Sequence, residues 1–243
     1  MRKTITTTFF SLRSPVLGLV FLFTFHFSPF ISIAQTPSQV IQKVNKNFSK
    51  VSNYSCDMLI HTDISFIKMN DIKAKIFFKR PNKFKIKAEG ILLLPKQNPN
   101  YMFAMLSDTA SYTAFKSGNE MVNGVNCSII NVLPLKDTAD LILGKFWIDE
   151  ARGIILKSNL TTRSNGTVLI EHFYGTNAQY ALADKLIFTI ETSKFKIPKA
   201  LVADLNSDSD DDNKSDAENK TSKITLTFSN YLVNKGVDDA VFK

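Results

Sequence analysis

Apolar side chains recur at every second position between residues 54 and 88, and this spacing constrains the fold more than any other feature of the chain. The first alternating run spans 54–66, and two more follow at 72–78 and 84–88, on either side of a turn at 80–82. Successive side chains of a strand point to opposite faces, so the runs predict an antiparallel meander with one apolar and one polar face. The residues predicted to line an apolar concavity on that face are Met58, Ile60, Ile64, Phe66, Ile76, Phe78, Phe84 and Ile86.

One segment before these strands has helical spacing instead. Pro37 suits the first turn of a helix, and Val40, Ile41, Val44 and Phe48 recur three or four residues apart. Polar residues fill the other positions. We therefore expect an amphipathic helix of about 13 residues that lies on another element.

The rest of the chain predicts further short strands. They are expected at 101–106, 111–115, 127–133, 145–149, 154–162, 167–174, 186–196 and 224–232, which gives about nine to eleven strands in all. The region 117–126 is rich in turn-forming residues. The region 134–144 is typical of a helical turn or a loop.

Residues 1–34 have the parts of a secretory signal peptide. Arg2, Lys3 and Arg13 are basic, 16–27 is apolar, and 32–34 has small residues two apart. The apolar run is shorter than the ~20 residues that a membrane span needs. No Cys follows it to carry a lipid. We therefore expect cleavage, export and a soluble periplasmic product.

The remaining residues, 35–243, have the length of a single domain. The formal net charge of the chain is +8, but 204–220 is strongly acidic. Because this stretch has almost no apolar residues, we expect a disordered or solvated insertion there. A basic body attracts anionic lipid or nucleic acid, and export disfavours nucleic acid as a partner.

The sequence contains no recognisable catalytic or metal-binding motif, so we expect neither enzymatic activity nor a cofactor or metal. His61 and His172, the histidines beyond the signal segment, stand far apart in the sequence. A nucleophile pair of Cys56 and His172 is a remote alternative, because nothing in the sequence brings them together. Cys56 and Cys127 form an even count, which permits one disulfide in an oxidising compartment. The alternative is that each is a small buried hydrophobe.

Basic residues gather on the polar face of the second and third runs. One interpretation is a solvated face that resists edge pairing. The other is a surface that binds anionic lipid headgroups or an acidic partner. The residues are Lys73, Lys75, Lys79, Arg80, Lys83, Lys85 and Lys87.

Five short motifs follow one another in a fixed order. They are KVSNY at 50–54, FKRPNKF at 78–84, VNCSIIN at 125–131, FWID at 146–149 and VDDAVF at 237–242. Their order resembles that of the outer-membrane lipoprotein carrier superfamily of LolA, LolB and RseB. The resemblance spans most of residues 37–243.

The resemblance implies a mainly β fold. The expected fold is an unclosed, strongly curved antiparallel β-barrel, or half-barrel, with an N-terminal amphipathic helix and short lid helices. Its concave face would hold acyl chains. Arg80 and Pro81 match the arginine-proline pair of the family, in which the arginine helps to hold the lid and controls cargo release. A guanidinium at this position can donate two hydrogen bonds to backbone carbonyls or a carboxylate, whereas the other interpretation is a solvated cation.

The function implied is that of a periplasmic, non-enzymatic, monomeric carrier or sensor in lipoprotein sorting. Its partners would be an acylated lipoprotein or lipid, an inner-membrane donor complex and an outer-membrane acceptor, with no nucleic acid. The missing N-terminal Cys and the single domain argue against LolB and RseB. The alternative is a non-enzymatic envelope interaction module with a packed core and a basic partner-binding face, an interpretation that the 20 Phe residues support.

Overall fold

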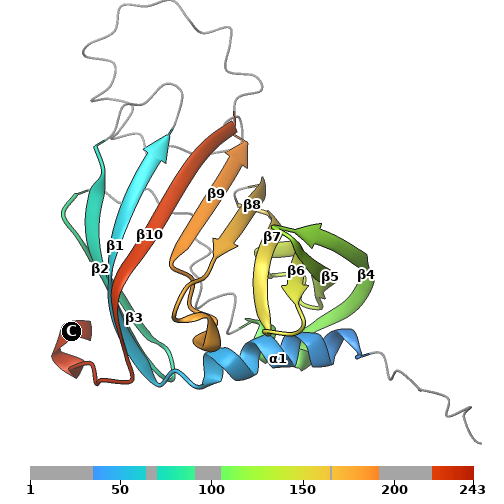
Figure 1. Ribbon diagram of the computed structural model, residues 1–243, viewed down its shortest axis with the longest axis horizontal. Coiled ribbons are helices and arrows are strands. Elements are labelled where there is room, and N and C mark those ends of the chain that lie inside the picture. Colours follow the sequence, from blue (N-terminus) through green and yellow to red (C-terminus); the bar gives the residue numbers. More distant parts are fainter. Residues whose placement is uncertain (1–34, 64–69, 91–104, 165, 192–220) are drawn as a thin grey trace, which may run out of the picture. The chain divides into compact units, whose positions relative to one another are not determined.

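Ten strands of the described residues pair into one antiparallel sheet in the computed structural model of the chain (Figure 1). The model describes residues 35–63, 70–90, 105–164, 166–191 and 221–243, which belong to one compact unit. The signal segment, Ile64, Phe66 and the acidic stretch 204–220 lie outside the described residues. The strands are β1 Asn53–Asp63, β2 Ile72–Lys79, β3 Lys83–Ala88, β4 Tyr112–Val122, β5 Val125–Pro134, β6 Leu141–Asp149, β7 Ile154–Thr162, β8 Gly166–Phe173, β9 Lys185–Glu191 and β10 Thr221–Val233.

The strand order shows that the sheet is open. It runs β3-β2-β1-β10-β9-β8-β7-β6-β5-β4, and the two terminal strands of this order, β3 and β4, are not paired with each other. The last strand, β10, inserts between β1 and β9 and so joins the first hairpins to the rest of the sheet. The sheet curves strongly along its width (Figure 1). The predicted mainly β, unclosed antiparallel fold is confirmed.

Helix α1, Pro37–Ser49, has the predicted length of 13 residues. Its N-terminus is closed by a capping box, in which Thr36 Oγ1 accepts a hydrogen bond from the Gln39 amide and Gln39 Oε1 accepts one from the Thr36 amide. The four apolar positions found from the sequence are all buried. Because this stripe needs an apolar partner, the helix lies across the sheet against β4 and β7 (Figure 1). No helix in the described ranges is both long and apolar enough to span a membrane.

Three local predictions differ from the structure. The strand expected at 101–106 is wrong where it is described, since 105–107 is helical. Most of the turn-rich region 117–126 belongs to strands, because β4 runs to Val122 and only Asn123-Gly124 turn, with φ of 49° and 79°. Strand β6 begins at Leu141, within the region expected to be a loop or a helical turn, because it pairs there with Thr162 of β7. Short 3-10 helices complete the described fold: η2 Thr109–Ser111, η3 Ala178–Tyr180 and η6 Asp239–Phe242.

Candidate functional site

The inner face of the sheet is apolar across five neighbouring strands, β2, β1, β10, β9 and β8. Register places Met58 of β1 between Ala74 of β2 and Phe228 of β10. Farther along, Phe188 of β9 lies between Ile224 and Ile170. The buried polar residues Thr62, His172 and Ser222 lie on the same face. The buried apolar side chains of this inner face are Tyr54, Cys56, Met58, Ile60, Ala74, Ile76, Phe78, Val168, Ile170, Leu186, Phe188, Ile190, Ile224, Leu226 and Phe228.

Six of the eight residues predicted to line a concavity are described, and all six contribute to the core. Met58, Ile60, Ile76 and Phe78 are 1–5% exposed, and Phe84 and Ile86 are partly buried against them. Ile64 and Phe66 lie outside the described residues. The predicted lining left out β8, β9 and β10, although their sequences show the same alternation.

Hydrogen bonds attach the middle of α1 to the turn between β6 and β7. Lys43 Nζ donates to the Glu150 carbonyl oxygen at 2.5 Å, and Asn47 Nδ2 donates to the Arg152 carbonyl oxygen at 2.8 Å. Both acceptors are main-chain atoms of a tight turn. The helix is therefore held at the β6–β7 turn by polar contacts as well as by its apolar stripe.

Arg80 attaches the C-terminal end of α1 to the turn between β2 and β3. Its Nε donates to the Val51 carbonyl oxygen at 2.6 Å, and its Nη2 donates to the Phe48 carbonyl oxygen at 3.0 Å. The guanidinium carbon also lies 5.3 Å from the centroid of the Phe48 ring. Carbonyls at a helix C-terminus lack partners within the helix and favour a cation. Pro81 follows through a cis peptide bond and is exposed.

Asn234, which the sequence analysis missed, holds the link between α1 and β1. Its Oδ1 accepts a hydrogen bond from the Ser52 amide at 2.7 Å, and its Nδ2 donates to the Lys50 carbonyl oxygen at 2.8 Å. The residue has a positive φ of 57°, which Asn tolerates better than most residues. A lone Asn after a strand carries no signal for a partner more than 180 residues away in the sequence.

Cys56 and Cys127 do not form the disulfide that the sequence permits. Both are free and buried, as in the alternative interpretation. The reason is the strand order, because β10, β9, β8, β7 and β6 lie between β1 and β5 in the sheet, whereas a disulfide needs Cα atoms about 4.4–6.8 Å apart. Burial raises the pKa of the Cys56 thiol to about 12 and that of Cys127 to about 11.

Both thiols should therefore resist modification in the folded protein. Each unit of pKa above the ambient pH lowers the reactive thiolate fraction tenfold, so we expect reaction with dithionitrobenzoate at pH 8 to be at least about 100-fold slower than in denaturant. The measurement is the release of thionitrobenzoate, followed by its absorbance at 412 nm. Rapid reaction of the native protein, or no free thiol in the denatured unreduced protein, would contradict the buried free cysteines.

The two described histidines occupy different environments. His172 of β8 is buried, its Nε2 lies 3.0 Å from Ser158 Oγ, and burial lowers its pKa to about 3. His61 is exposed, with its Nδ1 2.7 Å from Asp71 Oδ1. Cys56 and His172 lie on strands separated by β10 and β9. Within the described ranges, no three His, Cys, Asp or Glu side chains are grouped to hold a metal ion.

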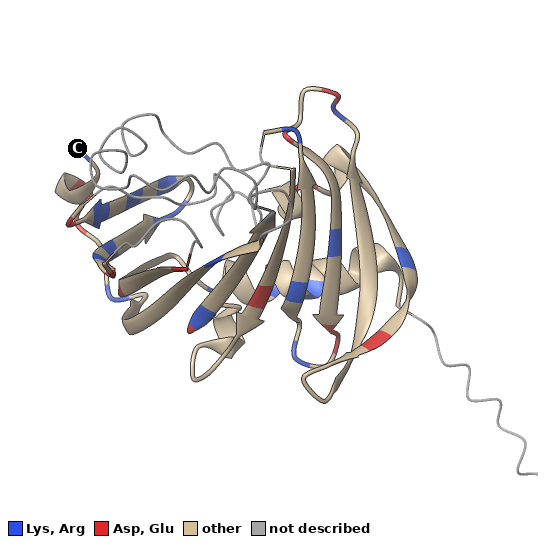
Figure 2. Cartoon of the chain, turned by 90° about the horizontal axis from the view of Figure 1, so that it is seen from above, with Lys and Arg blue, Asp and Glu red and all other residues tan. Residues whose placement is uncertain are grey.

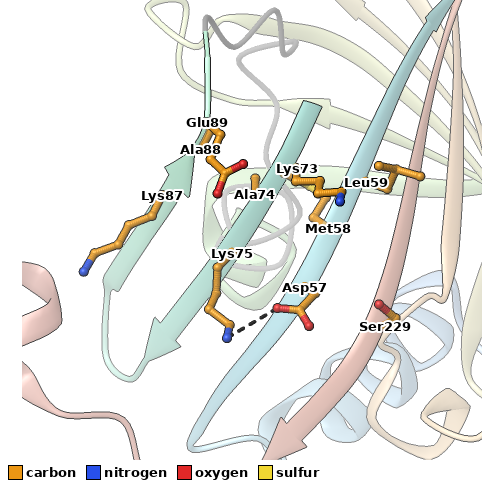
Figure 3. Close-up of a pocket in the computed structure, with 10 residues that line it drawn as sticks. All are labelled: Asp57, Met58, Leu59, Lys73, Ala74, Lys75, Lys87, Ala88, Glu89 and Ser229. Atoms are coloured by element: carbon orange, nitrogen blue, oxygen red, sulfur yellow. Dashed lines mark ion pairs between the residues drawn. The ribbon is translucent and has the colours of Figure 1, made fainter. Parts of the chain in front are cut away.

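A pocket of about 520 Å³ lies beside the polar, outer face of β10, β1, β2 and β3 (Figure 3). Its charged side chains come from exposed or half-exposed positions, and Lys75 Nζ lies 3.4 Å from Asp57 Oδ1. The Asn230 amide, which bonds Asp57 at 2.8 Å, and then Lys75 hold the pKa of Asp57 below its usual value. Six of its ten lining residues are charged or polar, and Met58 is the one residue that it shares with the predicted apolar lining. Its lining is Asp57, Met58, Leu59, Lys73, Ala74, Lys75, Lys87, Ala88, Glu89 and Ser229.

Solved structures of proteins from three bacteria have a similar fold. A LolA superfamily protein from Nitrosomonas europaea aligns with a TM-score of 0.56 and 10% identity over 86% of this chain and 98% of that chain. A DUF1329 family protein from Desulfovibrio piger has a TM-score of 0.55 and 11% identity over 85% and 95%. A domain from Vibrio parahaemolyticus named for outer membrane lipoprotein sorting has a TM-score of 0.51 and 9% identity over 85% of this chain and 95% of that chain.

No family model and no curated protein sequence matches the chain. The likeness to known proteins is therefore one of structure. At 9–11% identity this likeness establishes the fold. The chain has the LolA-like fold, an open and curved antiparallel sheet crossed by an N-terminal helix.

Proposed function

We propose that the chain is a periplasmic, non-enzymatic carrier or sensor that binds the acyl chains of a lipoprotein or lipid on the inner face of its sheet. In this proposal residues 1–34 are removed on export and 35–243 act as one monomeric domain. The observation that carries the proposal is the apolar inner face shared by β2, β1, β10, β9 and β8. Each methylene transferred from water to such a surface contributes ~0.8 kcal/mol, so a long acyl chain would bind without any polar recognition.

Binding requires the inner face to open. Met58, Ile60, Ile76 and Phe78 are 1–5% exposed, so an acyl chain enters only when neighbouring elements move away. Helix α1 is the element best suited to move, because its polar attachments through Lys43, Asn47 and Arg80 can break without disturbing the sheet ladder. An inner-membrane donor complex would load the opened carrier, and an outer-membrane acceptor would unload it.

The first test is native mass spectrometry of the purified protein, which should show adducts of lipid mass. The second is titration with a fluorescent long-chain fatty acid. We expect Ala74→Phe, which places a ring on the inner face, to weaken binding at least about tenfold, since it occupies the space of several methylenes. Leu59→Phe, on the outer face of the neighbouring strand, is the matched control and should leave the affinity unchanged.

The alternative function is an envelope interaction module with a packed core, and one observation favours it. Phe48, Phe78 and Tyr54 form an aromatic cluster, with ring centroids 5.6 Å and 5.4 Å apart, between α1 and the inner face. In such a module the wild-type protein would bind no fatty acid. Ala74→Phe would then only lower the melting temperature, because overpacking costs about 1–3 kcal/mol.

A further inference from the structure

The outer face of the β2–β3 hairpin pairs like charges across its two strands. In register, Lys75 lies opposite Lys87 and Lys79 opposite Lys83. Like charges directly opposite each other destabilise a sheet, so these lysines need anionic partners. Figure 2 shows several Lys and Arg positions, coloured blue, on the strands beside the C-terminus. The groups that contact these lysines in the structure indicate which kind of ligand the face can bind.

One end of this face is occupied by the chain's own C-terminal segment, Val237–Lys243. Asp239 Oδ1 lies 3.0 Å from Lys79 Nζ and 2.8 Å from Lys83 Nζ. Lys85 Nζ donates to the main-chain oxygen of Lys243 at 2.6 Å. The Phe242 ring lies 5.9 Å from Lys83 Nζ. A carboxylate and an aromatic ring, carried on a short peptide, are therefore the groups seated here.

This occupancy is weak enough to be reversed. Asp239 has a side chain that is 54% exposed, and no residue of η6 is buried. Solvent-exposed ion pairs of this kind contribute little to stability, because water screens both charges. A second acidic peptide with more contacts would therefore displace the C-terminal segment.

The other end of the face offers lysines to such a peptide. Lys73, Lys75 and Lys87 stand around the outer pocket (Figure 3). Lys75 is paired with Asp57, while Lys87 lies 5.7 Å from the Phe77 ring and forms no ion pair with any described residue. The basic face thus extends beyond the lysines that the C-terminal segment contacts.

Strand β3 also supplies a backbone edge. It is the terminal strand of the described sheet and pairs only with β2 among the described strands. Lys83, Lys85 and Lys87 point to its outer face at alternate positions. A strand added at this edge would place its own alternate side chains about 5 Å from those lysines. Carboxylates at every second position would match them.

We propose that the β2–β3 hairpin binds an extended, acidic segment of a partner protein along the edge of β3, and that the C-terminal segment competes for the same lysines. The proposal does not depend on acyl-chain binding. A protein segment fits better than an anionic membrane, because Asp57, Glu89 and Asp239 interrupt the face. A flat negative surface would be repelled by these carboxylates, whereas an alternating peptide can meet the lysines between them.

The test is fluorescence anisotropy of a fluorescein-labelled peptide of five Glu-Thr repeats with the full chain. Asp239→Asn should bind it about threefold to fivefold more tightly than the wild type, since the weak ion pairs that compete with the peptide are lost. Asp238→Asn is the matched control, because Asn still caps η6 in place of the Asp238 side chain. It should bind like the wild type.

Lysine variants and competing ligands complete the test. Lys83→Gln, Lys85→Gln and Lys87→Gln together should weaken binding about tenfold or more, as three cross-strand charge pairs are lost. The same change at exposed Lys46, Lys136 and Lys223 should have little effect. A peptide with five Glu followed by five Thr has the same composition without the alternation. If it binds as tightly as the alternating peptide, pairing along the edge of β3 is wrong. Lysine-dependent binding to phosphatidylglycerol vesicles without peptide binding, or no binding to either ligand, would overturn the proposal.

Discussion

Arg80→Leu should release a bound acylated peptide at least about tenfold faster than the wild type. The variant loses the hydrogen bonds to the Phe48 and Val51 carbonyl oxygens and the contact with the Phe48 ring. A hydrogen bond to a charged group contributes about 1.5–3 kcal/mol when buried and less here, because Arg80 is largely exposed. A loss of about 1.4 kcal/mol already changes an equilibrium tenfold. With α1 less firmly attached, the inner face should open more often.

The measurement is stopped-flow release of a fluorescent acylated peptide into excess lipid vesicles. Arg80→Lys keeps the charge but cannot reproduce the fork of two hydrogen bonds, so its release rate should lie between those of the wild type and the Leu variant. Lys83→Leu and Lys85→Leu are controls, because their partners belong to the C-terminal segment and not to α1. Equal release from all four variants would leave Arg80 without a latch role.

Acid should destabilise the fold through His172, an effect that His172→Gln should remove. Burial lowers the pKa of His172 from 6.5 to about 3. Between these two values the unfolded chain binds a proton that the folded chain does not. The free energy of unfolding is therefore unaffected by the titration of His172 above pH 6.5 and decreases as the pH falls toward 3. At ~1.4 kcal/mol per pH unit, about 3 kcal/mol of unfolding free energy should be lost between pH 7 and pH 4.

Urea unfolding of each variant at a series of pH values measures this loss. Glutamine stays neutral and can still bond Ser158, so the Gln variant should have a flatter profile than the wild type over this range. His61→Gln is the matched control, since the His61 side chain is 60% exposed, and it should keep the wild-type slope. A slope that remains in the His172 variant would assign the acid effect to carboxylates.

Local patterns predicted the elements whose residues interact with near neighbours in the sequence. The spacing of Val40, Ile41, Val44 and Phe48 predicted α1, and the alternation in 54–63 predicted which side chains of β1 are buried. The prediction of secondary structure failed where a segment becomes a strand only because it pairs with another strand. Strand β4, at the edge of the sheet, contains Gly118 and mostly exposed residues, so its second half resembled a turn until its pairing with β5 was known.

The site was predictable only in part, for the same reason. The identity of Arg80 and its place before a proline marked it as a candidate, but its acceptors lie 29 and 32 residues earlier in the chain. Asn234, the outer pocket and the contacts of Asp239 gave no local signal. Each of them joins segments that are distant in sequence, and side-chain composition does not show which segments will meet.

The sequence by itself determined which residues face inward, because a strand has a period of two and a helix a period of 3.6 whatever they pack against. Only the tertiary structure decided which strands are neighbours. The placement of β10 between β1 and β9 makes the inner face continuous across five strands, and the strand order separates Cys56 from Cys127. The period decides on which face of its strand or helix a side chain lies. Which side chains it meets there depends on the pairing of strands that are distant in sequence.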